Sequence, residues 1–126
     1  MPYARDGSRF LGATFDVGPL YRFNAVQDWL AREGLSVAGM LARVRDIEQT
    51  FLAASRSPDV CAANLVVRDA ARRGRFLAFR TPGAGEIVAR LAALNIIADH
   101  RGDRLRIGFG IYHGEDDAKR LAAALA

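Results

Sequence analysis

Lysine, cysteine and histidine are scarce in this sequence, and each shortage argues against a class of function. Lys119 is the only lysine, although the chain has 18 basic residues and a net charge of +4. The single cysteine, Cys61, cannot form an internal disulfide, which indicates a reducing compartment and predicts a cytoplasmic location. The two histidines, His100 and His113, have no cysteine or carboxylate at metal-ligand spacing, so the pattern does not support a metal site.

Long apolar runs are missing as well. No stretch approaches the ~20 apolar residues that a membrane-spanning helix needs, and the N-terminus lacks the apolar segment of a secretion signal. Hydrophobic residues make up 51% and charged residues 25% of the 126 positions, which is typical of one globular domain.

Arginines concentrate at "RDAARRGR", which contains Arg68, Arg72, Arg73 and Arg75. A nucleic-acid site would need aromatic side chains among them for stacking, and the nearest one, Phe76, is expected in the core. The favoured interpretation is therefore a solvated turn between two strands.

Helical periodicity dominates the first half of the chain. After an extended lead-in over 1–18, Pro19 opens a helix that Gly34 ends. Ser36 is a plausible N-cap for a longer helix, which ends before Pro58. Its apolar stripe has helical spacing and comprises Val37, Met40, Leu41, Val44, Ile47, Phe51 and Leu52.

Short strands and two further helices are predicted for the second half. The β-like runs are 64–68, 75–80, 95–100 and 103–113, the last two joined by a tight turn at 101–103. Apolar spacing predicts one helix from Ile87 to about Asn95 and another after the acidic residues 115–117. This order predicts a two-layer α+β sandwich over 35–126, with helices on one face of a small, mostly antiparallel sheet. Residues 1–34 are expected to form a separate lead-in and first helix, which belong to a contact with a large domain or a second subunit.

The run "DRLRIGFGIYH" at 103–113 raises the functional question. As a strand it sends Leu105 and its alternate neighbours to one face, and Arg106, Gly108, Gly110 and Tyr112 to the other. Two glycines beside an arginine leave room for a small acid, which a guanidinium binds with two parallel hydrogen bonds. The alternative is an ordinary cross-strand ion pair of Arg106 with Asp99 or Asp103.

The same region carries a family resemblance. "NIIADHRGDRLRIGFGIYH" resembles the last hairpin of kynureninase and, more widely, of class V aminotransferase-like enzymes, which are fold-type-I proteins dependent on pyridoxal phosphate. The matching positions are Ile97, Asp99, Arg101, Leu105, Arg106, Gly108, Phe109 and Tyr112. "RFLGATFDVGPLYRFNAV" is similar to the segment in which a Gly-Thr pair precedes a helix of the main domain.

The resemblance implies two site residues. Arg106 takes the place of the arginine that anchors the substrate's α-carboxylate, and Thr14 takes the place of the threonine that reaches the cofactor phosphate from a neighbouring subunit. Here the pair reads Gly-Ala-Thr, with an alanine inserted, and Phe15 stands where proline is usual. The reactive cysteine of the related desulfurases has no counterpart, because the loop before the last strand is only "RGD" and Cys61 lies elsewhere.

A pyridoxal-phosphate enzyme also needs a lysine that holds the cofactor and an acid near its pyridine nitrogen. The resemblance places both on the large domain, while Lys119 sits among polar residues of the last helix. We therefore expect the C-terminal domain of such an enzyme, catalytically inert by itself, with no cofactor bound to this chain alone and no catalytic residue of its own.

Partners follow from the apolar side chains of the first segment. Phe10, Phe15, Phe23 and Trp29 are expected to face a large domain or a second subunit. No nucleic-acid or membrane partner is expected. The alternative function is a stand-alone α+β module that binds a small carboxylate or dimerises, and a third is RNA binding through the arginines of 68–75.

Overall fold

The computed structural model describes residues 4–10 and 16–126, and the chain divides into two compact units, Met1–Ser36 and Val37–Ala126. The second unit is an α+β fold built on a three-stranded antiparallel sheet. Within the described ranges, no helix is long and apolar enough to cross a membrane.

The first unit contains a 3-10 turn, η1 (Gly7–Phe10), and one helix, α1 (Gly18–Arg32). Pro19 lies at its start, and Gly34 follows its end with a φ of +66°, so both predicted helix boundaries are confirmed. No residue of α1 is buried, and Phe23 and Trp29 are 59% and 46% exposed. The expected apolar side chains Phe23 and Trp29 are therefore exposed on α1, whereas Phe15 lies outside the described residues.

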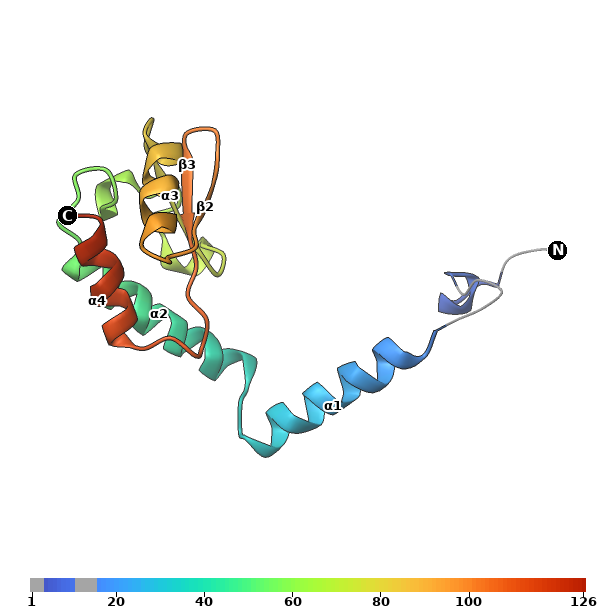
Figure 1. The fold of residues 1–126 in the computed structure, drawn as a ribbon. Helices are drawn as coiled ribbons and strands as arrows, with labels where there is room; N and C mark the ends of the chain where they lie inside the picture. The colour runs from blue at the N-terminus through green and yellow to red at the C-terminus, as the bar shows by residue number, and fades with distance from the viewer. Residues whose placement is uncertain (1–3, 11–15) are drawn as a thin grey trace. The chain divides into compact units, whose positions relative to one another are not determined.

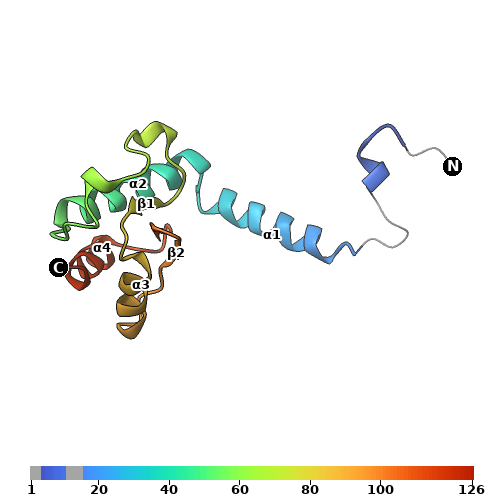
Figure 2. The ribbon, with the colours of Figure 1, turned by 90° about the horizontal axis from the view of Figure 1, so that it is seen from above.

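Two helices of the second unit, α2 (Val37–Ala54) and α4 (Glu115–Ala124), lie side by side, as both views show (Figures 1 and 2). Only the later part of the α2 stripe is buried: Val44 and Phe51 are fully enclosed, whereas Val37 is 75% exposed. The helix itself was predicted correctly, but its first turn does not reach the core.

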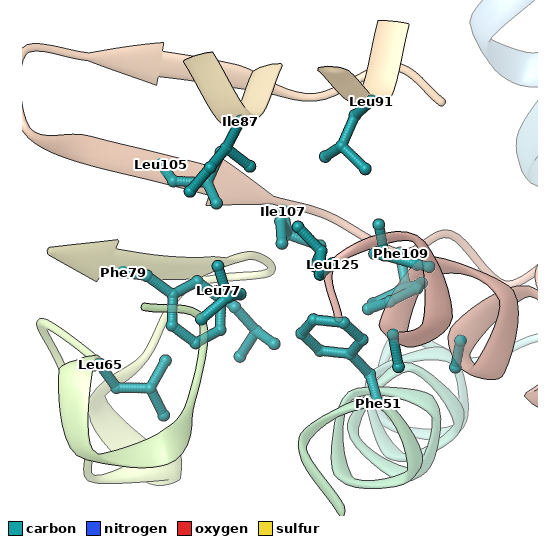
Figure 3. Packing of buried hydrophobic residues seen from close by; sticks show 14 of the residues in the cluster. Phe51, Leu65, Leu77, Phe79, Ile87, Leu91, Leu105, Ile107, Phe109 and Leu125 are labelled. Atoms are coloured by element: carbon teal, nitrogen blue, oxygen red, sulfur yellow. The ribbon is translucent and has the colours of Figure 1, made fainter. Parts of the chain in front are cut away.

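The sheet has the strand order β1-β3-β2, formed by β1 (Leu77–Arg80), β3 (Arg104–Ile107) and β2 (Asp99–Arg101). Leu77 pairs with Ile107 and Phe79 with Leu105, and these four apolar side chains are buried. Helix α3 (Ala84–Ala93) packs against β2 and β3 from the same side (Figures 1 and 3).

Phe51 joins the helical layer to the sheet (Figure 3). Its ring meets Phe79 edge-on at 6.3 Å between centroids, and it contacts Phe109 at 5.8 Å. Both separations fall in the range that aromatic pairs prefer. The core therefore occupies one face of the sheet, and the opposite face carries Ala78, Arg80, Arg104 and Arg106 at alternating positions.

The prediction of a strand at 64–68 is wrong. A 3-10 turn, η2 (Ala62–Asn64), occupies its start, and only Leu65 forms an isolated bridge, with Phe79. The Asn64 amide donates to the carbonyls of Pro58 and Asp59 at 2.9 and 3.0 Å. These bonds hold the segment in a loop, so it lies beside β1 without becoming a fourth strand.

The strand predicted from Asn95 begins later, at Asp99. Asn95 adopts a positive φ of 56°, and Ile96 donates its N–H back to the Leu91 carbonyl at 3.0 Å. Together with the bond from Asn95 to Ala92, this is a Schellman ending of α3. Asn95 and Ile96, which the apolar pattern assigned to the strand, therefore belong to the end of α3.

The last predicted strand, 103–113, is shorter than expected, because β3 ends at Ile107 where its partner β1 begins. The chain then turns toward α2, whose Arg43 donates to the carbonyls of Ile111 and His113 at 3.1 and 3.2 Å. The prediction that side chains alternate between the two faces of a strand as far as Gly110 and Tyr112 is therefore wrong beyond Ile107.

Candidate functional site

Arg106 lies on the face of the sheet opposite the core, directly across from Asp99 on β2. The guanidinium donates from Nε to Asp99 Oδ1 at 2.6 Å and from Nη2 to Asp99 Oδ2, a two-point pair. Of the two carboxylates proposed from the sequence, the partner is thus Asp99 and not Asp103. The ordinary cross-strand pair is present in the structure.

This pairing alters the acidity of both groups. The hydrogen bond from Arg106 holds the pKa of the Asp99 carboxyl below its ordinary value, and the nearby charge of Arg101 lowers it further. The same bond raises the pKa of the Arg106 guanidinium. Both groups are therefore charged across the physiological range, and the Nη1 end of the fork remains outside the pair.

Phe76 lies beside the Arg106 guanidinium, with the arginine carbon 5.9 Å from the ring centroid. The ring is 43% exposed, so the expectation that Phe76 belongs to the core is wrong. Both glycines follow the end of β3: a Cβ at Gly108 would touch Phe76 at 3.7 Å, and a Cβ at Gly110 would clash with the ring of Tyr112. The space expected over two glycines therefore reduces to Gly108, with an aromatic ring beside it.

A cavity of about 480 Å³ lies beside Gly108, lined by residues 95–98 and by residues of α4. Its charged groups are already engaged: Arg120 donates to the Leu94 carbonyl at 3.3 Å, and Asp117 accepts from the Gly114 N–H at 2.9 Å. Arg106 does not line this cavity. Arg106, the residue expected to bind a carboxylate, therefore lies on the surface of the sheet and not in this cavity.

The described residues do not fit pyridoxal phosphate. Lys119 is exposed on α4 and pairs with Glu115 at 3.2 Å, and it does not line the cavity beside Gly108. Thr14, the expected phosphate contact, lies outside the described residues.

The remaining reactive side chains have structural contacts. His113 accepts the Gly110 N–H at Nδ1, 2.8 Å away, and so fixes the turn before α4. The Cys61 sulfur lies 3.5 Å from the Pro58 carbonyl oxygen, and the residue is half-buried. Among the residues that the structure places, no cluster of histidine, cysteine and acidic side chains could hold a metal ion.

One charged cluster was missed by the sequence reasoning. Glu48 is fully buried and accepts at Oε2 from Arg45 at 2.8 Å and from Arg73 at 3.2 Å. Arg73 had been assigned to a solvated turn, but its side chain is only 8% exposed. The signal was available, because Glu48 stands four residues after Val44 and three before Phe51, within the apolar stripe of α2.

Comparison with protein families gives one match. Residues 42–125, two thirds of the chain, match the family model described as the kynureninase C-terminal domain. The matched region contains the whole sheet, Arg106 and Asp99. A search of curated proteins found no match.

Proposed function

The chain belongs to the kynureninase C-terminal domain family, and from this premise we propose that it serves a kynureninase-like enzyme dependent on pyridoxal phosphate. In this proposal Arg106 binds the α-carboxylate of an amino-acid substrate. The observation that supports this role is the position of the Arg106 guanidinium, which two hydrogen bonds to Asp99 hold on the uncovered face of the sheet.

The pair with Asp99 suits this role because a guanidinium can bind carboxylates along more than one edge. Asp99 takes the edge formed by Nε and Nη2, which leaves the end bearing Nη1 for a ligand. Asp99 is then a positioning residue that restricts the rotation of a long side chain before the substrate arrives. Phe76 supports the same orientation from the side.

Binding of a carboxylate at position 106 can be measured on the chain alone by following the backbone N–H signal of this residue in NMR. L-Kynurenine, the amino acid for which the family is named, should shift this signal, and the analogue lacking the carboxyl group should not. Arg106→Gln should abolish binding, and Asp99→Asn should weaken it. Arg90→Gln, an exposed arginine on α3, is the control with equal loss of charge. A shift that the decarboxylated analogue reproduces would exclude the carboxylate role.

Catalysis is proposed to need groups that this chain does not supply. Lys119 is paired and exposed, so the chain alone should be inert and should not alter the absorbance of added pyridoxal phosphate in a Lys119-dependent way. An absorbance change lost in Lys119→Arg would contradict this. Determining whether an in-frame segment upstream encodes a large domain with a cofactor lysine would test the parent enzyme directly.

The apolar side chains of α1 are proposed to dock on a large domain or on a second copy of the chain. Phe23 and Trp29 expose large apolar surfaces that monomeric proteins seldom leave uncovered. Sedimentation of the chain with Phe23→Ser and Trp29→Ser tests self-association, which the substitutions should abolish. A cytoplasmic location is also proposed, supported by the single unpaired Cys61.

The stand-alone carboxylate-binding module is the second candidate, and the same Arg106–Asp99 pair favours it. It differs in needing neither a large domain nor a cofactor. If the chain binds small carboxylates at metabolite concentrations, and no large domain is encoded upstream, the module is favoured over the enzyme domain.

A further inference from the structure

Three arginines form a row across the sheet. Arg104 on β3 pairs with Arg80 on β1 and with Arg101 on β2 in the backbone register. Residues directly opposite in antiparallel strands point to the same face, with their Cβ atoms ~4.5–5.5 Å apart. The three side chains therefore leave the sheet together, on the face opposite the core.

This arginine row, defined as Arg80, Arg104 and Arg101, is poorly neutralised. Asp103 lies 3.8 Å from Arg80 and 3.7 Å from Arg104, whereas Asp99, whose carboxylate also feels the charge of Arg101, is paired with Arg106. Neither contact of Asp103 is a hydrogen bond, and Arg101 has no ion pair within the ranges that the structure covers. The Arg80 and Arg104 side chains are 64% and 45% exposed.

The arginine row lowers the stability of the sheet. Like charges directly opposite one another across strands destabilise a sheet, and Arg104 has such a neighbour on both sides. Neutral residues such as threonine suit exposed strand positions better. A repulsive arrangement kept on an uncovered face is typical of a surface whose function costs stability.

We propose that the arginine row binds an acidic segment of a partner protein, a role separate from substrate binding at Arg106. The strands are ~4.8 Å apart, so the row spans ~10 Å, the reach of two or three carboxylates on an extended peptide. Guanidinium groups match carboxylates in two-point geometry, and the binding of several carboxylates relieves the repulsion among the arginines.

A protein segment fits better than a nucleic acid. Asp99 and Asp103 flank the row and would repel a continuous phosphate backbone. The aromatic ring on this face, Phe76, already lies against Arg106 and is not aligned with the row for base stacking. A short acidic peptide can place its carboxylates on the row and avoid both aspartates.

The test uses the full chain and N-acetylated hexaglutamate amide, with hexaglutamine amide as the neutral peptide. Calorimetry should show binding of hexaglutamate that weakens as salt rises, and no binding of hexaglutamine. Arg104→Gln should weaken binding by about fivefold, and the triple change of Arg80, Arg101 and Arg104 to Gln by more than tenfold. The matched control removes three exposed arginines elsewhere: Arg56, Arg72 and Arg90.

Thermal unfolding provides a second readout that a purely structural role would not give. Because Arg104→Gln removes repulsion on both sides, its Tm should rise by about 2–5 °C while peptide binding falls. Equal losses of binding in the control triple variant would overturn the proposal. So would a lower Tm for Arg104→Gln, or tighter binding of a ten-residue oligothymidylate than of hexaglutamate.

Discussion

Replacing Glu48 with glutamine tests whether the buried charge cluster joins α2 to the segment before β1. The substitution keeps the size of the side chain and one acceptor oxygen, but it removes the negative charge between two arginines. Arg73, with a side chain 8% exposed, would then remain in the interior without a counter-charge. Arg45 is 16% exposed and also donates to the Arg73 carbonyl at 2.7 Å, so it can turn partly toward solvent.

The expected loss follows from this difference in burial. Breaking a buried ion pair by removing one partner costs about 3–5 kcal/mol, because the other charge stays desolvated. Since both arginines keep some contact with water, we expect Glu48→Gln to lower the free energy of unfolding by about 2–4 kcal/mol. Glu115→Gln removes a pair with a lysine in which the side chains are 71% and 57% exposed, and should cost about 0.3–0.5 kcal/mol.

Urea unfolding followed by far-UV circular dichroism measures both variants under the same conditions. Hydrogen exchange of the β3 amides then confirms that the loss belongs to the Val37–Ala126 unit. A double-mutant cycle with Arg73→Gln should show that the second substitution costs much less once Glu48 has been neutralised. If Glu48→Gln and Glu115→Gln destabilise the chain equally, the burial argument is refuted.

Three further changes test local features. Because the pKa of Asp99 is lowered in the folded chain, the ionised carboxylate contributes stability above its ordinary pKa, and this contribution is lost as pH falls through the lowered value. An NMR titration of Asp99 should give a midpoint below the ordinary value, and Arg106→Gln should return that midpoint to the ordinary value. Gly102 has a φ of +55° with open space at Cβ, so Gly102→Ala should cost about 1 kcal/mol in urea unfolding and Gly102→Asn less, and equal costs would contradict the conformational argument. A Cβ at Gly110 would clash with the ring of Tyr112, which is 84% exposed and lies 4.5 Å from the His113 ring between centroids. Gly110→Ala should therefore displace the Tyr112 ring and shift its NMR signals yet cost less than about 1 kcal/mol, and a larger loss would show the ring to be held in place.

Periodicity predicted the elements whose apolar residues form the core. The later part of the α2 stripe and the alternation around Leu105 both led to residues that are buried. The errors arose where a polar group or a helix ending overrode the apolar pattern. The Asn64 side chain holds a β-like run in a loop by hydrogen bonding, and the positive φ of Asn95 ends α3 within residues that were predicted as strand. Such choices depend on hydrogen bonds between segments, which a hydrophobic pattern does not encode.

The candidate site was predicted only in outline. Arg106 and its possible partner Asp99 were identified, because a hairpin with a short turn brings them opposite one another. Phe76 was misplaced although strand alternation from Leu77 would have sent it outward. Glu48 was left out of the predicted stripe of α2 because of its charge, whereas its spacing put it among the buried residues. In both cases position was a better guide than chemical character.

The hairpin register links the two charged features of the uncovered face. The turn at Gly102 sets Asp99 opposite Arg106, and the same alignment necessarily sets Arg101 opposite Arg104. A slip of one residue would turn Leu105 away from the core, so the register is fixed by burial and not by the charges. The attractive pair and the repulsive row therefore come from one alignment, and the repulsion could have been removed by replacing Arg101 or Arg104 without disturbing the pair. The presence of both Arg101 and Arg104, despite their mutual repulsion, is the reason to expect that the arginine row binds a ligand.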